Sequence, residues 1–399
     1  MKQSFFINNR TAIAEKLSGG LLVISAYTKM QRMSDMAAMF EQEPNFWYLT
    51  GIEYADWILV LDGSTGNSWL IAPKIDSVHS LFDGSLSYSD AKDISGVDRV
   101  VDADEGVELL RQLSRKHSVV HTIGQPMHAN RYGFTLNPSI AALRQKLQRT
   151  FTHLRDADKE LSGMRAIKQP EELVAIKKAV TQTCASFDTV RQKLDTFKYE
   201  YEIAAEFDYD FRRLGTKGHA YDPIIASGLN ACTLHYVANN SRLKKPSLVL
   251  MDVGARVGGY AADITRTYAY GTVTVRQKQI HEAVQGAHTR AIELLRPGLS
   301  VIEYQQEVDD IMKEALKSLG LQHDSDSLRR YFPHAISHGL GVDVHDSLGA
   351  PKYFLPNMVL TVEPGIYIPE ESIGVRIEDD ILITANKHEN LSRKLSVSW

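Results

Sequence analysis

Two glutamates fifteen positions apart, Glu363 and Glu378, lie at equal distances from a turn at residues 369–372. Pro369 and Ser372 favour a turn there. Strands running out on either side would bring the two carboxylates opposite each other, directly or one residue out of register. Opposed side chains in an antiparallel pair have Cβ atoms about 4.5–5.5 Å apart. Two such carboxylates repel unless positive charge lies between them, so the pair predicts a cation site.

A pair of aspartates repeats this arrangement upstream. Residues 248–253 have the apolar pattern of a buried strand, and residues 260–264 are expected to be its return. The intervening Val257-Gly258-Gly259 is a strong hairpin signal because glycine adopts positive φ. Asp252 and Asp263 are equidistant from a centre at Val257/Gly258. We therefore expect them to face each other on one side of the sheet.

Four carboxylates in one cleft would repel prohibitively without bound cations or protons. Two divalent ions balance the four charges, and His338, in the glycine-flanked run Ser337-His338-Gly339, would complete the ligand set. Oxygen-dominated ligation with one nitrogen and no sulfur favours Mn²⁺, Co²⁺, Fe²⁺ or Zn²⁺ over a structural thiolate zinc. Two such ions about 3.5–4 Å apart can activate water for hydrolysis. Taken singly, each pair fits solvated surface or turn chemistry, and His338 fits a structural role; their joint occurrence favours the metal site.

The elements that must position these residues occur twice, in the order helix, helix, hairpin. Pro170 is tolerated in the first turn of a long helix, and Ser300 with Glu303 is a capping box that opens another. The predicted helices span 170 to about 192, 201–213, 277–295 and 300 to about 319, and the hairpins span 248–269 and 358–384. A histidine-bearing loop precedes each hairpin, with His235 in the first and His334, His338 and His345 in the second. We expect a duplicated unit whose hairpins join into one curved sheet.

Residues 1 to about 157 alternate strand and helix patterns and are expected to form a separate domain. Strands are predicted at 21–24, 57–61, 68–72 and 119–124, and a helix at 105–115. An aromatic-rich segment, 45–51, precedes the second strand. No group of residues in this region indicates a catalytic or metal-binding site. A scaffold domain is the favoured interpretation, and a role in shaping a neighbouring site is the alternative.

Length and composition agree with a two-domain globular protein. The chain has 399 residues, 43% of them hydrophobic, and a formal net charge of −4. It carries no basic block that would indicate nucleic acid, and its apolar runs fall short of the ~20 residues that span a bilayer. Cys184 and Cys232 are its two cysteines, too few for a disulfide framework or a thiolate metal site. The N-terminus lacks a secretory signal pattern, so we expect a cytoplasmic protein.

The motifs around the five candidate ligands resemble those of the pita-bread metallopeptidases, the family of methionine aminopeptidase, prolidase and aminopeptidase P. The motifs are Asp-Val-Gly, Gly-Tyr-Ala-Ala-Asp-Ile-Thr-Arg, Glu-Pro-Gly and Arg-Ile-Glu-Asp. The resemblance covers about 158–399. It implies an α+β pita-bread catalytic domain with an internal pseudo-twofold repeat, preceded at 1–157 by an α/β domain of the creatinase/aminopeptidase P N-terminal type. That long N-terminal domain resembles Xaa-Pro aminopeptidases most. One position departs: Gly339 stands where the best-known bacterial aminopeptidase P carries tryptophan.

The resemblance also implies which residues would bind each metal ion. Asp263 and Glu378 would bridge two ions, Asp252 would bind one of them, and His338 and Glu363 would bind the other. Glu363 would in addition carry a proton from the attacking water to the leaving imino nitrogen.

Further residues match family positions around the substrate. His235 and His345 would contact the substrate and stabilise the tetrahedral oxyanion. His334 would support them. Arg376, on the same strand face as Glu378, is expected to hold that carboxylate, and Tyr367 to line the cleft. For Arg376 and Tyr367 a plain structural role is the alternative.

We therefore predict a cytoplasmic hydrolase that removes the N-terminal residue from peptides with a free N-terminus and proline second. It would use two divalent ions, with Mn²⁺ preferred over Co²⁺, Zn²⁺ or Fe²⁺. A prolidase restricted to Xaa-Pro dipeptides is the alternative. A peptide-binding module without catalysis is a second alternative, which the five intact ligand positions disfavour. We expect a homo-oligomer, a dimer or tetramer, that binds neither nucleic acid nor membrane.

Overall fold

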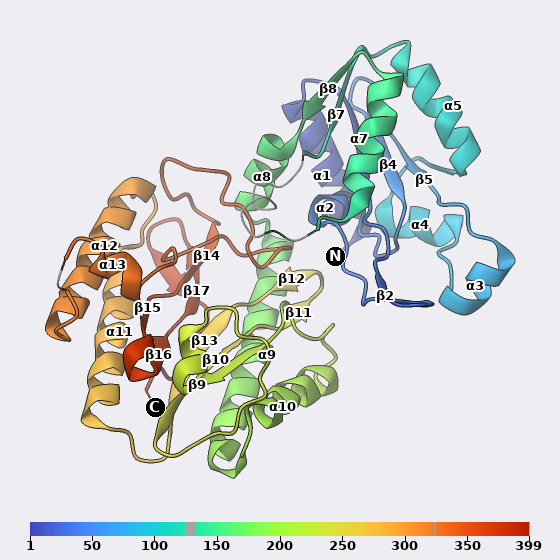
Figure 1. Cartoon of the computed structure of the whole chain (residues 1–399). Coiled ribbons are helices and arrows are strands. Elements are labelled where there is room, and N and C mark those ends of the chain that lie inside the picture. Colours follow the sequence, from blue (N-terminus) through green and yellow to red (C-terminus); the bar gives the residue numbers. More distant parts are fainter. Residues whose placement is uncertain (125–132, 134, 323, 399) are drawn as a thin grey trace. The chain divides into compact units, whose positions relative to one another are not determined.

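The computed structural model describes residues 1–124, 133, 135–322 and 324–398. It divides into two compact units, Met1–Met164 and Arg165–Trp399, each with its own strands and hydrophobic core (Figure 1). None of the described helices combines the length and hydropathy needed to span a lipid bilayer.

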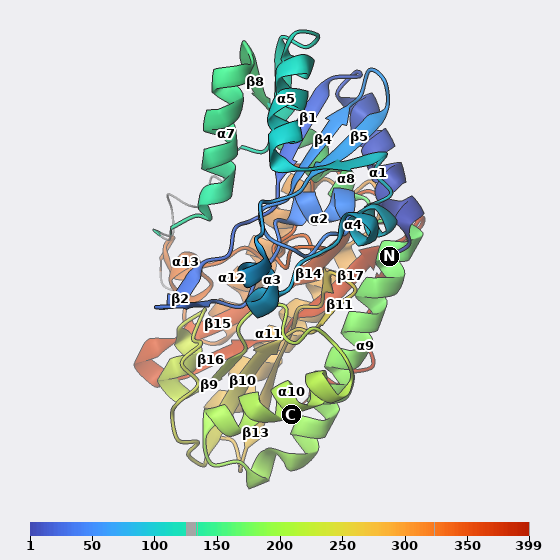
Figure 2. The same cartoon turned by 90° about the vertical axis from the view of Figure 1, so that its right-hand side faces the viewer.

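The first unit is built on a six-stranded mixed sheet between two groups of helices. Leu21 and Val23 point to one face of the sheet, where they pack with Leu110, Leu143 and Leu147 from two helices. The strands, in spatial order, are β6 (Arg99–Val101), β5 (Asn67–Ile71), β4 (Ile58–Asp62), β1 (Leu21–Ser25), β7 (Val119–Thr122) and β8 (His153–Asp156). Helices α5 (Ala103–Ser114) and α7 (Pro138–Thr150) cover this face, and α1 (Gln3–Lys16), α2 (Pro44–Thr50) and α4 (Tyr88–Ser95) lie on the other (Figure 2). The predicted strands and the helix at 105–115 are confirmed, and the aromatic segment at 45–51 forms most of α2.

The remaining elements of this unit are short. They are the hairpin β2 (Gln31–Met33) and β3 (Met36–Ala37), the helix α3 (Ser77–Asp83), and the helix α8 (Asp158–Ala166) that leads into the second unit.

The second unit contains the predicted order of helices and hairpins twice. The first half contains α9 (Pro170–Lys193), η1 (Leu194–Thr196), α10 (Glu200–Arg213), β9 (Ile224–Ser227), η2 (Gly228–Cys232), β10 (Ser247–Val253), β11 (Arg256–Val257), β12 (Tyr260–Ala261) and β13 (Ile264–Tyr270). The second half contains α11 (Val275–Leu294), α12 (Val301–Ser318), α13 (Ser327–Tyr331), β14 (Val359–Val362), β15 (Gly365–Ile368), η3 (Pro369–Glu371), β16 (Ile373–Arg376), β17 (Asp379–Ile383) and β18 (His388–Asn390). The four predicted helices are confirmed, with ends shifted by one or two residues.

Helices α11 and α12 cover one side of these strands, while α9 and α10 lie on the other side (Figure 1). The apolar stripe of α11 explains its place, because Ile280, Val284, Ala287 and Ala291 recur at helical spacing and are buried in the main core. They pack with strand residues of the second hairpin, including Val375. The carboxylate-bearing strands are thereby held on a rigid base.

The aspartate hairpin turns one residue later than expected. Gly258 and Gly259 both have positive φ, 58° and 88°, as a two-residue type I′ turn requires. The register therefore pairs Asp252 with Thr265. The expectation that Asp252 directly faces Asp263 is wrong, although Asp263 remains on the same face because it lies two residues from Thr265.

The glutamate hairpin has the predicted register. Val362 pairs with Asp379 and Gly365 pairs with Arg376, so the same register runs on both sides of Glu363 and Glu378 and sets them opposite each other. Ser372, with φ of 53°, supplies the turn. A bridge between Thr265 and Glu378 joins the two hairpins. Joined in this way, the hairpins present their acidic side chains on one face.

Candidate metal centre

The strand pairings place three of the candidate ligands in a row. Asp252 pairs with Thr265, Thr265 bridges to Glu378, and Glu378 lies opposite Glu363. Asp263 joins the row from the turn end of the first hairpin. Asp252, Asp263 and Glu378 are buried, and Glu363 is partly exposed.

The candidate ligands form overlapping groups with ligand atoms within 4.8 Å of one another. The groups are Asp252–Asp263–Glu378, His338–Glu363–Glu378 and Asp263–His338–His345. The structure thus brings together all five residues for which a metal role is predicted, and adds His345 beside them.

His338 reaches this cluster from a segment that runs along β14. Its carbonyl accepts a hydrogen bond from the Thr361 amide at 2.9 Å, and the Glu363 amide donates to the Ile336 carbonyl at 2.9 Å. The adjacent Gly339 pairs with Asp346, and a Cβ at position 339 would lie 2.4 Å from the Asp346 carbonyl oxygen. Any side chain larger than that of glycine at this position would therefore require the backbone at Asp346 to shift.

Burial and mutual repulsion disfavour full ionisation of the carboxylates. Burial, with the charges of Asp263, Glu363 and Asp252, raises the pKa of Glu378 well above its usual range. Burial, with Asp263 and Asp252, also raises the pKa of Glu363 to about 7, against the opposing charges of His338 and Arg376. The neighbouring side chains therefore supply too little positive charge to balance the carboxylates.

The pKa of His338 is also raised by the surrounding negative charge. Burial lowers its pKa, but the hydrogen bond to Asp263 and the charge of Glu363 outweigh burial and raise the pKa to about 9. The His338 Nε2 lies 3.4 Å from an Asp263 oxygen and 3.6 Å from a Glu363 oxygen. A donor set of four carboxylates and one imidazole that attracts positive charge in this way fits a pair of divalent cations.

Arg376 holds a different carboxylate from the one expected. Its Nη2 donates to Asp252 Oδ2 at 2.5 Å, its Nη1 to the Tyr367 hydroxyl at 2.9 Å and its Nε to the Thr265 hydroxyl at 3.2 Å. The prediction that Arg376 hydrogen-bonds Glu378 is therefore wrong. Both side chains point to the same face, but the guanidinium reaches across to β10. Its positive charge still lowers the pKa of Glu378 against the other contributions.

Tyr367 and His334 continue this chain of contacts. The Tyr367 hydroxyl hydrogen-bonds His334 Nε2 at 2.8 Å, and His334 Nδ1 lies 3.5 Å from a Glu363 oxygen. Burial and the charge of Arg376 lower the pKa of His334 to about 3, so the ring is neutral at physiological pH. Tyr367 and His334 therefore lie next to the candidate metal ligands.

The two histidines assigned to the substrate are exposed. The His345 ring packs edge-on against His338 with centroids 4.4 Å apart. His235 lies in the loop after η2 and in none of the ligand groups found among the described residues.

Two further residues at the centre were not predicted from the sequence. The Tyr221 hydroxyl lies 2.5 Å from Asp252 Oδ1 and 2.6 Å from Asp263 Oδ1, and so links the two aspartates. The Thr265 hydroxyl donates to Glu378 Oε2 at 2.7 Å. Thr265 was detectable from the alternation of strand side chains, since it lies two residues after Asp263. Tyr221 has no comparable signal because it lies outside both hairpins.

Comparison with known families identifies this arrangement. Residues 174–385 match the model of metallopeptidase family M24, and residues 6–121 match that of the aminopeptidase P N-terminal domain. The chain belongs to metallopeptidase family M24. It is an enzyme of the metalloaminopeptidase type, with the predicted N-terminal α/β domain followed by an M24 pita-bread domain.

Individual M24 relatives are similar along almost the whole chain. The Xaa-Pro aminopeptidase of Escherichia coli is 34% identical, over 97% of this chain and 94% of its own length. Xaa-Pro aminopeptidase 3 of Mus musculus is 32% identical, over 88% of this chain and 74% of its own. The structure of zinc-substituted E. coli aminopeptidase P in complex with product matches with a TM-score of 0.86 and 32% identity, covering 99% of this chain and 96% of that one.

Proposed function

We propose that this M24 enzyme is an Xaa-Pro aminopeptidase, which hydrolyses the bond before a proline in the second position of a peptide. The observation that carries the proposal is the convergence of Asp252, Asp263, His338, Glu363 and Glu378 in one acidic cluster. The similarity to Xaa-Pro aminopeptidases over nearly the whole chain supports it.

The same five residues would hold two divalent metal ions. When bound, the ions supply the positive charge that the carboxylates lack and polarise the peptide bond under attack. We propose Mn²⁺ as the native metal because the ligands are mainly oxygen, with Co²⁺, Zn²⁺ and Fe²⁺ as substitutes. The zinc-substituted relative supports divalent binding without deciding among these metals.

Glu363 is the residue suited to moving the proton. Its carboxylate is the most accessible of the four, since Asp252, Asp263 and Glu378 are buried while Glu363 is partly exposed, so water and substrate can reach it. In the proposed reaction it accepts a proton from the attacking water and delivers it to the departing proline nitrogen. That nitrogen leaves poorly unless it is protonated.

The surrounding histidines would orient the substrate. His345 is exposed beside His338, and His235 is exposed on the loop after η2. In the proposed reaction both rings contact the carbonyl and stabilise its developing negative charge. Arg376, Tyr367 and His334 form a hydrogen-bonded series from Asp252 toward Glu363 that would keep these carboxylates in place.

The preference for longer peptides follows from the cations near the centre. A dipeptidase must bind the free carboxylate of the proline, usually through a positioned cation. Arg376 is buried, and its three nitrogens already bond Asp252, Tyr367 and Thr265. It is therefore poorly placed to bind a product carboxylate, which favours an aminopeptidase.

A peptide panel tests the proposal. The metal-loaded enzyme should cleave Xaa-Pro-Yaa tripeptides and longer peptides with higher kcat/KM than Xaa-Pro dipeptides, as measured by mass spectrometry of the products. Acetylation of the N-terminal amine should abolish cleavage. Cleavage of dipeptides with tripeptides untouched would instead identify a prolidase, and absence of all cleavage would identify a binding module.

We also propose that the enzyme is a cytoplasmic homo-oligomer, a dimer or tetramer. Sedimentation of the purified chain and fractionation of the cells that produce it would test these two points.

A further inference from the structure

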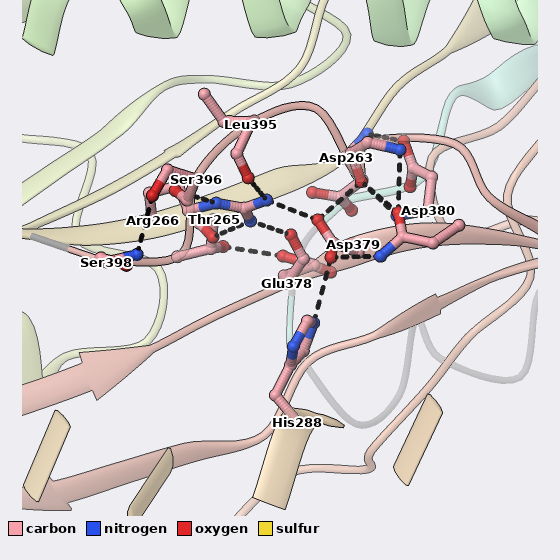
Figure 3. Close-up of polar contacts among 12 residues, drawn as sticks. Asp263, Thr265, Arg266, His288, Glu378, Asp379, Asp380, Leu395, Ser396 and Ser398 are labelled. Atoms are coloured by element: carbon pink, nitrogen blue, oxygen red, sulfur yellow. Dashed lines mark hydrogen bonds and ion pairs between the residues drawn. The ribbon is translucent and has the colours of Figure 1, made fainter. Parts of the chain in front are cut away.

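A second polar cluster lies on the opposite face of the strands from the metal centre. Arg266 and Asp379 directly follow Thr265 and Glu378, so strand alternation points them away from the ligands. Both are buried, Arg266 at 0% and Asp379 at 2% exposure. The Arg266 Nη2 donates to Asp379 Oδ1 at 2.6 Å (Figure 3).

The same guanidinium holds the backbone at the junction of the two hairpins. Arg266 Nη1 donates to the Thr265 carbonyl at 2.9 Å and to the Glu378 carbonyl at 2.7 Å. These are the two residues of the bridge that joins the hairpins. On the metal face, the Thr265 hydroxyl in turn donates to the Glu378 carboxylate. One buried guanidinium thus fixes the main chain from which that carboxylate projects.

The end of β18 and the residues that follow it complete the cluster. The carbonyls of Leu395 and Ser396 accept from Arg266 at 3.1 and 3.2 Å (Figure 3). The Asn390 amide and the Ser392 hydroxyl each donate to Asp379 at 2.6 Å. Every oxygen of the Asp379 carboxylate is therefore bonded, and the guanidinium is held on three sides.

We propose that Arg266 and Asp379 are positioning residues for Glu378 and that, with segment 390–396, they set the metal affinity of the centre. The inference rests on the proposed function, which assigns Glu378 as a metal ligand. Partners that orient a ligand typically change metal affinity or activity by about 10–100-fold when they are removed. A planar guanidinium can satisfy several acceptors at fixed angles, which a lysine ammonium cannot reproduce.

The decisive variant is Arg266→Lys, which keeps the charge but loses the planar fork. Its matched control is Arg10→Lys in the first unit. Arg10 is likewise buried, and it donates to the carbonyls of Leu49, Ser95 and Gly96. Both substitutions should lower the unfolding temperature. Calorimetric titration of the metal-free proteins with Mn²⁺, well below that temperature, measures metal affinity apart from stability.

We expect Arg266→Lys to raise the metal dissociation constant at least tenfold and Arg10→Lys to leave it within twofold of wild type. Wild-type affinity in folded Arg266→Lys would overturn the inference while leaving the proposed function intact. A wild-type chain that binds no divalent metal would overturn both.

If Arg266→Lys does not fold, Ser392→Ala takes its place. This change removes one donor to Asp379 and leaves the ion pair in place, so we expect about a threefold or greater loss of metal affinity. Ser95→Ala is its control, because Ser95 is also fully buried, and its hydroxyl donates to the Ala91 carbonyl and accepts from the Val97 amide, both within the first unit. Equal affinities in the two serine variants would overturn the inference.

Discussion

The guanidinium of Arg376 donates to the carboxylate of Asp252 at 2.5 Å and thereby joins β16 of the second hairpin to β10 of the first. Asp252 and Arg376 are both buried. Without the other hairpin, the charge of either residue would be buried and unpaired. Loss of either member would leave a buried charge unpaired, which is more damaging than loss of the pair as a whole.

We predict that Arg376→Lys lowers kcat by about 10–100-fold, because one ammonium cannot bond Asp252, Tyr367 and Thr265 at once. Steady-state kinetics with metal analysis measure the effect. Arg329→Lys is the control, since Arg329 pairs with Asp309 at the exposed surface and the change should be neutral. Normal turnover in Arg376→Lys would show that the guanidinium geometry is dispensable.

Glu363→Gln should reduce kcat by several orders of magnitude. The amide keeps the shape of the side chain but can no longer accept the proton, and it removes one charge from the ligand set. Single-turnover measurements at saturating metal, with bound metal quantified, separate the two losses. A metal-loaded Glu363→Gln enzyme that turns over normally would exclude the proton-transfer role.

His345→Ala should retain metal and lose much of the rate, since the ring is assigned to the substrate and to the oxyanion. The comparison of metal content with kcat for this variant distinguishes the roles. Loss of metal together with activity would instead make His345 a ligand, as its place in the group with Asp263 and His338 permits.

Tyr221→Phe tests the link between the two aspartates. Removal of the hydroxyl that lies 2.5 Å from Asp252 and 2.6 Å from Asp263 should weaken metal affinity or activity by about 10–100-fold. Tyr304→Phe is the matched control, because the buried Tyr304 hydroxyl finds no hydrogen-bond partner among the described residues. Its removal should leave metal binding unchanged, and equal behaviour of the two variants would contradict the prediction.

The sequence predicted the parts of the centre that depend on local patterns. Turn residues and alternating apolar residues located both hairpins, and the glutamate register followed from the positions of Pro369 and Ser372. The aspartate register was missed by two residues because the turn uses Gly258 and Gly259, not Val257 and Gly258. Hairpin centres are set by which residues take positive φ, and adjacent candidates are hard to separate by composition.

Contacts between distant segments could not be read from spacing. Arg376 and Asp252 are 124 positions apart, and Tyr221 is 31 and 42 positions from its two partners. The alternation of side chains gave the face on which Arg376 lies but not the strand to which it reaches. That choice depends on how the two hairpins are joined at Thr265 and Glu378.

Metal removal should destabilise the fold as well as abolish activity. Ions that bind only the folded state stabilise it by about 2.7 kcal/mol at a concentration 100 times the dissociation constant. A chelator should therefore lower the unfolding temperature by several degrees, and Mn²⁺ or Co²⁺ should restore both stability and activity. Chelator-resistant activity in protein shown to contain no metal would refute the dinuclear site.

The last prediction concerns Glu172, which is buried in the first turn of α9. Its two oxygens accept hydrogen bonds from the Tyr260 hydroxyl and the Gln169 amide, each at 2.8 Å. Burial raises its pKa from 4.5 to about 7, although these bonds and the charge of Lys168 oppose the shift. The folded chain therefore holds this proton more tightly than the unfolded chain. The resulting stabilisation is complete below about pH 4.5 and is lost as pH rises through 7.

Glu172→Gln cannot ionise. Its altered hydrogen bonds should lower the free energy of unfolding by the same amount at every pH. Between pH 5 and pH 8, however, its stability should rise relative to that of the wild type by roughly 1–3 kcal/mol, because only the wild type ionises. Denaturant unfolding in the presence of a chelator measures this difference without a contribution from metal binding. Glu171→Gln, an exposed neighbour in the same turn, should not alter the pH dependence. Parallel stability curves for Glu172→Gln and wild type would show that Glu172 does not titrate between these pH values.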